Sequence, residues 1–266
     1  MIDQFNSSFY FERRWFFSHQ HYVEENMGGV IFYSIQPYGR KHYKLYKLSN
    51  KDRCSHRQEA LHDLVRHVYM EDEESIVFHR VQFLKATELT LWCGCNYSTA
   101  VIFHHIICLT QLTNLTINWG VFCFDQLLEL LSITLNIQTL KLYSIRLYQP
   151  NPISIQQTEF FRLVYNGNKI TSLTISHICS LDKYELLVTL CPRLQYMILN
   201  ISINDLESII KLLLMKTNAN IRHLFSLCLL NATTKMYQIL KIMIDSEKFL
   251  DNYSIKLAHQ KLYLWW

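Results

Sequence analysis

The chain is poor in glycine and proline, the two residues that most often interrupt regular structure. Its 266 residues include only 6 Gly and 4 Pro, whereas average usage would give roughly three times as many. This shortage excludes collagen, flexible linkers and low-complexity disorder. A glycine-rich phosphate loop is also excluded, because no such cluster of glycines occurs. The length suits one large domain or two small ones with a sizeable core.

The sequence also lacks a secretory signal and a membrane-spanning run. Charged residues such as Asp3 and Glu12 interrupt the first 22 residues, so no apolar core of a signal peptide is present. The most apolar stretch, 99–117, contains His104 and His105 and is too polar for a span of about 20 residues. The 8 cysteines stand mostly among leucines and isoleucines, as buried free thiols of intracellular proteins do. We expect a cytoplasmic or nuclear protein without membrane contact.

Net charge is small but unevenly distributed. The formal charge of +4 does not by itself indicate a polyanionic partner. The basic segment 40–57 sets seven cations against the single acid Asp52 and interleaves them with Tyr43 and Tyr46. Such a segment could bind nucleic acid, with the rings stacked on bases. A strand with one solvated face, followed by a polar connection, is the simpler interpretation.

The most informative feature is a repeat of three apolar residues in the order apolar-x-x-apolar-x-apolar. Its six copies are Ala86, Leu89, Leu91; Leu112, Leu115, Ile117; Ile137, Leu140, Leu142; Ile170, Leu173, Ile175; Leu194, Met197, Leu199; and Leu224, Leu227, Leu229. The central residues are 26, 25, 33, 24 and 30 positions apart. This regularity predicts a short strand in each copy.

Amphipathic helix patterns lie between these copies. The clearest, over 206–214, has the i, i+3, i+4, i+7, i+8 spacing of an apolar stripe, and shorter stripes occupy 127–131 and 236–243. A polar acceptor followed three residues later by Glu predicts a capped helix start. Two such pairs are present, Asn204 with Glu207 and Asp182 with Glu185. Each unit is therefore expected to be a strand, a turn, a helix and a return, stacked on its neighbours in a parallel sheet.

At these residues the chain resembles a leucine-rich-repeat protein, over roughly residues 81–250. The resemblance implies an α/β fold: an irregular leucine-rich-repeat solenoid with a parallel strand face and helices on the outer face. The array is expected to be irregular because one position of the repeat, which holds Asn or Cys in regular repeats, holds other residues here. In this chain that position holds Gly94, Gly120, Ile145, Ile178, Ser202 and Ala232.

A second resemblance lies in the aromatic segments 11–17, 32–38 and 253–266, which look like elements of an expanded group of F-box-like proteins. It implies a substrate-recognition component of a ubiquitin ligase. No segment has the Leu-Pro-x-Glu-Leu opening of an F-box. The adaptor of a cullin-type ligase is therefore an expected partner only if an F-box lies upstream.

Both ends of the chain are expected to hold β-structure. The runs 13–22 and 30–35 predict a hairpin, with Gly28 and Gly29 in its turn. A helix is expected near 61–68. The runs 253–257 and 261–265 alternate like strands that could cover the open end of the repeats. The expected division is 1–79 (hairpin, basic segment and helix), 80–250 (about six repeats) and 251–266 (C-terminal cap strands).

Candidate chemistry is sparse. Zinc takes about four Cys or His ligands, and the strongest cluster is Cys93, Cys95, His104 and Cys108. Its first spacing is shorter than usual for zinc, so buried thiols are the simpler interpretation. His19 and His21 share one strand face but lack a third ligand. No paired-carboxylate, HExxH or GxSxG motif occurs, so we expect a non-enzymatic protein without metal or cofactor.

The expected binding surface is the strand face, because residues between the apolar positions point to that side. Its residues are mostly neutral and polar with few cations, which favours a protein over a nucleic-acid partner. The predicted contact residues are Glu88, Trp92, Asn114, Lys141, Tyr143 and Tyr196. The aromatic members are the expected anchors, unless they only cover strand edges.

Overall fold

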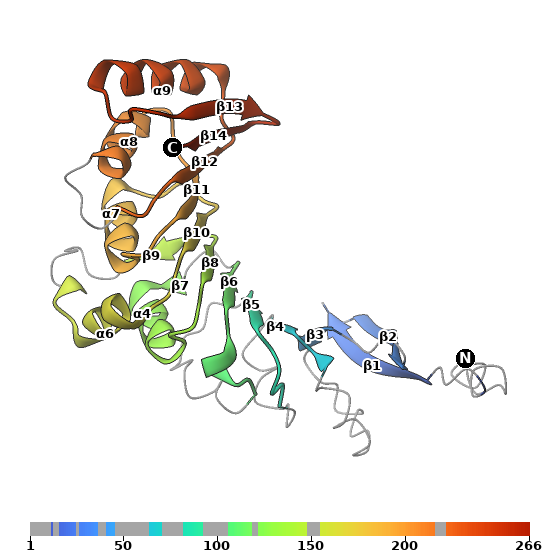
Figure 1. The fold of residues 1–266 in the computed structure, drawn as a ribbon. Helices are drawn as coiled ribbons and strands as arrows, with labels where there is room; N and C mark the ends of the chain where they lie inside the picture. Colours follow the sequence, from blue (N-terminus) through green and yellow to red (C-terminus); the bar gives the residue numbers. More distant parts are fainter. Residues whose placement is uncertain are drawn as a thin grey trace. The chain divides into compact units, whose positions relative to one another are not determined.

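The computed structural model describes residues 12, 16–24, 27–36, 41–45, 64–70, 82–92, 106–118, 122–147, 155–215 and 222–266, with 16–24 and 27–36 as backbone only. These residues form an α/β protein with a largely parallel β-sheet (Figure 1). The chain divides into two compact units, 1–112 and 113–266. The expected division at residues 79 and 250 stays a prediction.

The first unit begins with the predicted hairpin. Strands β1 (Phe16–Glu24) and β2 (Met27–Gln36) pair antiparallel. The hairpin is confirmed, but the expected place of its glycines is wrong. Gly28 and Gly29 lie opposite Val23 and Tyr22 within the ladder, because the strands continue to pair as far as Glu24 and Met27.

Three parallel strands follow in the first unit: β3 (His42–Leu45), β4 (His67–Met70) and β5 (Glu88–Leu91). The expectation of a helix through Val68 is wrong, since this residue lies in β4 opposite Leu89. The physical reason is visible in the sequence. Val65, Val68 and Met70 repeat the apolar-x-x-apolar-x-apolar order, and all three are buried.

The second unit contains five parallel strands in sequence order: β6 (Asn114–Ile117), β8 (Thr139–Leu142), β10 (Ser172–Ile175), β11 (Tyr196–Asn200) and β12 (Ser226–Leu230). Short strands β7 (Phe122–Cys123) and β9 (Ile145–Arg146) form a separate parallel pair. The strand prediction is confirmed for all six copies, and every apolar residue of the pattern is buried. In the second unit their central residues are register partners: Leu115, Leu140, Leu173, Met197 and Leu227.

The helices of the second unit lie on one side of this sheet (Figure 1). They are α4 (Phe124–Ile133), α6 (Glu159–Gly167), α7 (Leu181–Leu190), α8 (Leu206–Leu214) and α9 (Thr234–Glu247). The apolar stripe of α8 is buried, as its spacing predicts. A 3-10 turn, Leu109–Gln111, belongs to the first unit.

Both predicted capping pairs are wrong. Helix α8 begins after Asp205 and α7 after Ser180, and neither cap makes a side-chain hydrogen bond to its helix. Asp182 already lies in the first turn of α7, where a carboxylate is favoured by the helix dipole rather than by capping. Capping hydrogen bonds are instead made by Thr158 and Thr233, whose hydroxyls accept from backbone amides three residues on.

The C-terminal hairpin covers the last parallel strand, as predicted. Strands β13 (Ser254–Ala258) and β14 (Lys261–Trp265) pair antiparallel. His259 and Gln260 have φ of 49° and 58°, as both central residues of a type I′ turn require. Strand β14 also pairs antiparallel with β12, so the edge of β12 is hydrogen-bonded.

Within the described ranges, no helix combines the length and the apolar character needed to cross a bilayer.

Candidate interaction surface

The strand face of the second unit consists of two rows of side chains that point away from the helices. The inward residues of each strand are buried leucine, isoleucine or methionine, so the residues between them face outward. Register partners at the strand starts are Asn114, Thr139, Ser172, Tyr196, Ser226 and Trp265. The next row holds Thr116, Lys141, Thr174, Ile198, Cys228 and Tyr263.

The six predicted contact residues are divided between the two units. Glu88, half-buried, and Trp92, exposed, belong to the first unit. In the second unit Asn114 and Tyr196 stand in the same row, and Lys141 and Tyr143 are exposed on and just after β8. The prediction that these residues bind a partner stays a prediction.

Three exposed aromatic side chains gather at the β11–β12–β14 end of this face. We call Tyr196, Phe225 and Trp265 the aromatic patch; their side chains are 46%, 38% and 43% exposed. The rings of Tyr196 and Phe225 meet edge to face with centroids 4.7 Å apart. Trp265 lies two strands from Tyr196, with the small Ser226 between them. An exposed aromatic surface of this kind suits apolar contact with a protein.

Sequence reasoning found Tyr196 but missed the other two members of the patch. Phe225 directly precedes β12, outside the alternation that identified the face. Trp265 was assigned to a capping role, yet its neighbours Leu264 and Leu262 make the buried contacts with β12. The alternation of side chains along β14 could have identified Trp265, because it places this residue on the opposite face of the sheet from Leu264.

The patch and its strands are held by buried polar contacts on the helix side. The hydroxyl of Tyr184 on α7 donates to the carbonyl of Asn200 at 2.8 Å and accepts from the amide of Cys179 at 3.2 Å. Burial raises the pKa of Tyr184 to about 12. The ring is fully buried, so this hydroxyl fixes the end of β11 to the loop before α7.

Asn168 performs a similar function between α6 and β10. Its side-chain amide donates to the carbonyls of Val164 at 2.6 Å and Leu190 at 2.9 Å, and its oxygen accepts from the amide of Ile170 at 3.2 Å. One buried amide thus satisfies the ends of two helices and the start of a strand.

The zinc candidate is only partly within the described residues. Cys108 is half-buried, with its sulfur 3.4 Å from the hydroxyl of Thr110, whereas the other three members, Cys93, Cys95 and His104, lie outside them. In the described ranges no three His, Cys, Asp or Glu side chains are placed to hold a metal. His19 and His21 lie in β1, where only the backbone is described.

The remaining described cysteines are buried free thiols, as their apolar neighbours predict. They are Cys123, Cys179, Cys191 and Cys228. Complete burial raises the pKa of Cys191 to about 12, and burial also raises the pKa of Cys179 and Cys228. Such thiols are not activated nucleophiles.

The basic segment is described only at its start. Strand β3 has one solvated face, as the simpler interpretation predicts, and Tyr43 is buried against Phe83 with ring centroids 4.9 Å apart. Its ring is therefore not available for stacking on bases. Residues 46–57 lie outside the described ranges.

A cross-strand cluster on the first unit was also missed. His67 accepts or donates a 2.8 Å hydrogen bond between Nε2 and the hydroxyl of Thr90, and its Nδ1 lies 3.5 Å from a carboxylate oxygen of Glu88. The ring also stacks on Tyr69 at 3.9 Å. The order hydroxyl, imidazole, carboxylate occurs in nucleophilic catalysis. Here, however, Thr90 is only 4% exposed, and the cluster ties the neighbouring strands β4 and β5 together.

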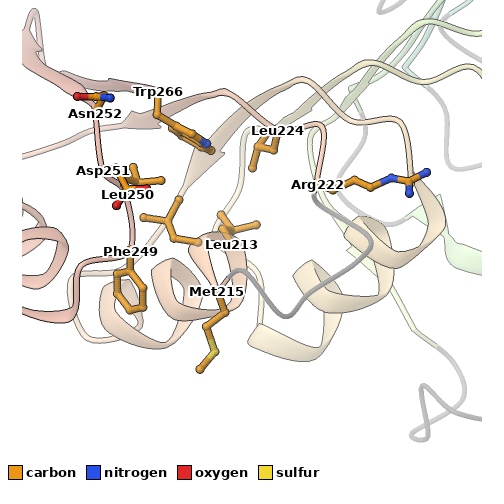
Figure 2. Close-up of a pocket in the computed structure, with 10 residues that line it drawn as sticks. Leu213, Met215, Arg222, Leu224, Phe249, Leu250, Asp251, Asn252 and Trp266 are labelled. Carbon is orange, nitrogen blue, oxygen red and sulfur yellow. The ribbon is translucent and has the colours of Figure 1, made fainter.

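A cavity of about 450 Å³ opens on the helix side, at the start of β12 (Figure 2). Leu213, Leu224, Phe249 and Trp266 form most of its apolar lining. The guanidinium of Arg222 points away from this lining (Figure 2). Trp265 and Trp266, adjacent in sequence, therefore contribute to the strand face and the cavity respectively.

No protein-family model matches the sequence, and searches of curated proteins and of solved structures find no match either.

Proposed function

We propose that this protein is a non-enzymatic scaffold of the leucine-rich-repeat type, which binds a protein partner on its strand face. The observation that carries the proposal is the register of the second unit. Five successive strands present buried apolar residues on one side, and on the other side mostly half-buried polar residues together with the exposed Lys141 and Tyr196. Stacked units of this kind create extended surfaces suited to binding.

The chemistry of the strand face supports a protein partner. Its uncharged polar side chains resemble the rim of a protein interface, and the aromatic patch supplies the large rings that dominate binding energy. Because these rings are exposed while the residues beside them in the strands are buried, they can contribute to binding without contributing much to folding.

A narrower proposal concerns the pathway. The aromatic segments that resemble F-box-like proteins lead us to propose a substrate receptor of a cullin-type ubiquitin ligase, in the cytoplasm or nucleus. This proposal is tested by pull-down of the full-length gene product with the adaptor subunit of such ligases. Adaptor capture is expected; no capture would remove the ligase function and leave the scaffold.

The scaffold itself is tested by partner capture with two matched double variants. Tyr196→Ala with Trp265→Ala removes two rings of the patch, and we expect loss of most captured protein. Phe160→Ala with Ile242→Ala removes two equally exposed apolar side chains from α6 and α9, and we expect capture to persist. Equal loss in both variants would contradict a specific strand-face site.

A further inference from the structure

Three cations occupy the starts of consecutive strands in the second unit. Lys169 stands four residues before Leu173, and Arg193 stands four residues before its register partner Met197. Arg222 stands five residues before Leu227, the next partner. All three side chains are exposed. We call them the cationic row.

In the part of the chain that the structure describes, the cations of this row are not joined to acids by ion pairs, although Asp251 lines the same cavity as Arg222. Lys169 donates from Nζ to the amide oxygen of Asn136 at 2.7 Å, and Arg222 donates from Nε to Nε2 of His223 at 3.1 Å. Neither acceptor is a carboxylate. Within the described residues, none of the three cations forms an ion pair with Asp or Glu.

An exposed aromatic ring follows each arginine at the same distance in sequence. Tyr196 comes three residues after Arg193, and Phe225 three residues after Arg222. These two rings are in contact at 4.7 Å. The chain thus places an exposed arginine three residues before each of these two rings.

The strands of the second unit carry positive rather than negative side chains. The seven strands β6, β8 and β10–β14 contain three lysines and no Asp or Glu. Four acids of the second unit, Asp125, Glu159, Asp182 and Glu207, lie in the first turns of helices, and Asp251 lines the same cavity as Arg222. The helix dipole favours anions in a first turn, but it does not account for the absence of acids from the strands.

We infer that the starts of β10, β11 and β12 bind an acidic peptide segment in extended form. Neighbouring strands are about 4.8 Å apart, and alternate side chains of an extended peptide are about 6.6 Å apart. Long Lys and Arg side chains span this difference. A peptide lying between the cationic row and the rings would direct carboxylates at alternate positions to the cations, and the intervening apolar side chains to Tyr196 and Phe225 on its other side. The inference rests on the proposed scaffold function and names the chemistry of its partner.

The test uses direct binding of the full chain to fluorescein-labelled peptides of alternating Glu and Leu. Binding is expected, and it should weaken when ionic strength rises from about 0.1 M to about 1 M, since the screening length falls from about 10 Å to about 3 Å. The double variant Arg193→Gln, Arg222→Gln should weaken binding about tenfold. The matched control Lys235→Gln, Lys241→Gln removes two exposed cations from α9 and should change binding less than twofold.

Two comparison peptides test the ionic contact and the apolar contact separately. Replacing Glu by Gln should abolish binding to the cationic row, and replacing Leu by Ser should weaken the contact with the rings. Equal binding of the Glu and Gln peptides, equal loss in the two double variants, or no binding at all would overturn the inference. Tighter binding of single-stranded oligothymidylate, lost in the same arginine variant, would overturn it in favour of nucleic acid.

Failure of this inference is distinguishable from failure of the scaffold. The peptide assay needs no natural partner. A scaffold that loses its captured partner on Tyr196→Ala with Trp265→Ala, but binds no acidic peptide, retains the proposed function and refutes only the partner chemistry.

Discussion

The two sides of the sheet in the second unit differ in how much the residue type changes from strand to strand. On the helix side the central register row reads Leu, Leu, Leu, Met, Leu from β6 to β12, and all five side chains are buried. On the strand side the first row reads Asn, Thr, Ser, Tyr, Ser. The helix side is uniform because every strand must fit the same packing, whereas the strand side can vary without loss of the fold.

The largest expected effect is on the uniform side. Leu173→Ala deletes a fully buried side chain and should lower the free energy of unfolding by about 3 kcal/mol through lost burial and a residual cavity. Its neighbour Thr174 points to the strand face, and Thr174→Ala should change stability by less than about 0.5 kcal/mol. Denaturant unfolding measures both. Similar losses in the two variants would remove the distinction between the sides.

A slightly smaller effect is expected at the buried amide between α6 and β10. Asn168→Ala leaves the carbonyl of Leu190 and the amide of Ile170 without this partner, and we expect a loss of about 2–3 kcal/mol. Asn166, exposed near the end of the same helix, provides the control, because Asn166→Ala breaks no buried contact. Thermal melting of both proteins checks the difference; a stable Asn168→Ala protein would show that water replaces the amide.

Tyr184→Phe should cost about 1–2 kcal/mol at neutral pH, because it removes a hydroxyl that bridges Cys179 and Asn200. The effect should also depend on pH. The pKa of Tyr184 is raised from 10.0 to about 12 in the fold, so the folded state favours the neutral phenol. Its stabilising contribution is complete below pH 10 and is lost as pH rises from about 10 to about 12.

The measurement for Tyr184 is therefore the difference in unfolding free energy between wild type and variant across alkaline pH. This difference should shrink above pH 10. Tyr165→Phe serves as a control, since Tyr165 is an exposed tyrosine on α6. A difference that stays constant through pH 12 would contradict the buried hydrogen-bonded phenol.

The smallest stability effect is expected on the varied side. Tyr196→Ala removes a ring that is nearly half exposed, so unfolding free energy should change by less than about 1 kcal/mol. Thermal melting provides the check. A loss as large as that of Leu173→Ala would mean that Tyr196 belongs to the core.

The sequence predicts the helix side well because burial repeats there. The positions 89, 115, 140, 173, 197 and 227 were identified from spacing alone, and all are buried in strands. The same rule, applied to Val65, Val68 and Met70, could also have found β4. A helix was predicted there instead, because an apolar stripe with helical spacing, Leu61–Val68, overlaps the strand. Periodicity alone cannot separate two patterns that share residues.

Helix starts and the binding side were less predictable. The pairs Asn204–Glu207 and Asp182–Glu185 have capping spacing, yet the helices begin one residue later and two residues earlier than these pairs imply. The aromatic patch depends on contacts between β11, β12 and β14, which are far apart in sequence. Only the register of the hairpin β13–β14 against β12 brings Trp265 into the row of Tyr196.

Folding and binding should use opposite sides of one sheet. An alanine scan through β10, β11 and β12, with melting temperature and partner capture measured on the same samples, tests this separation. Both quantities should alternate with a period of two residues and in opposite phase: substitutions at inward positions lower the melting temperature, and substitutions at outward positions lower capture. Capture that falls only where melting temperature falls would contradict the separation.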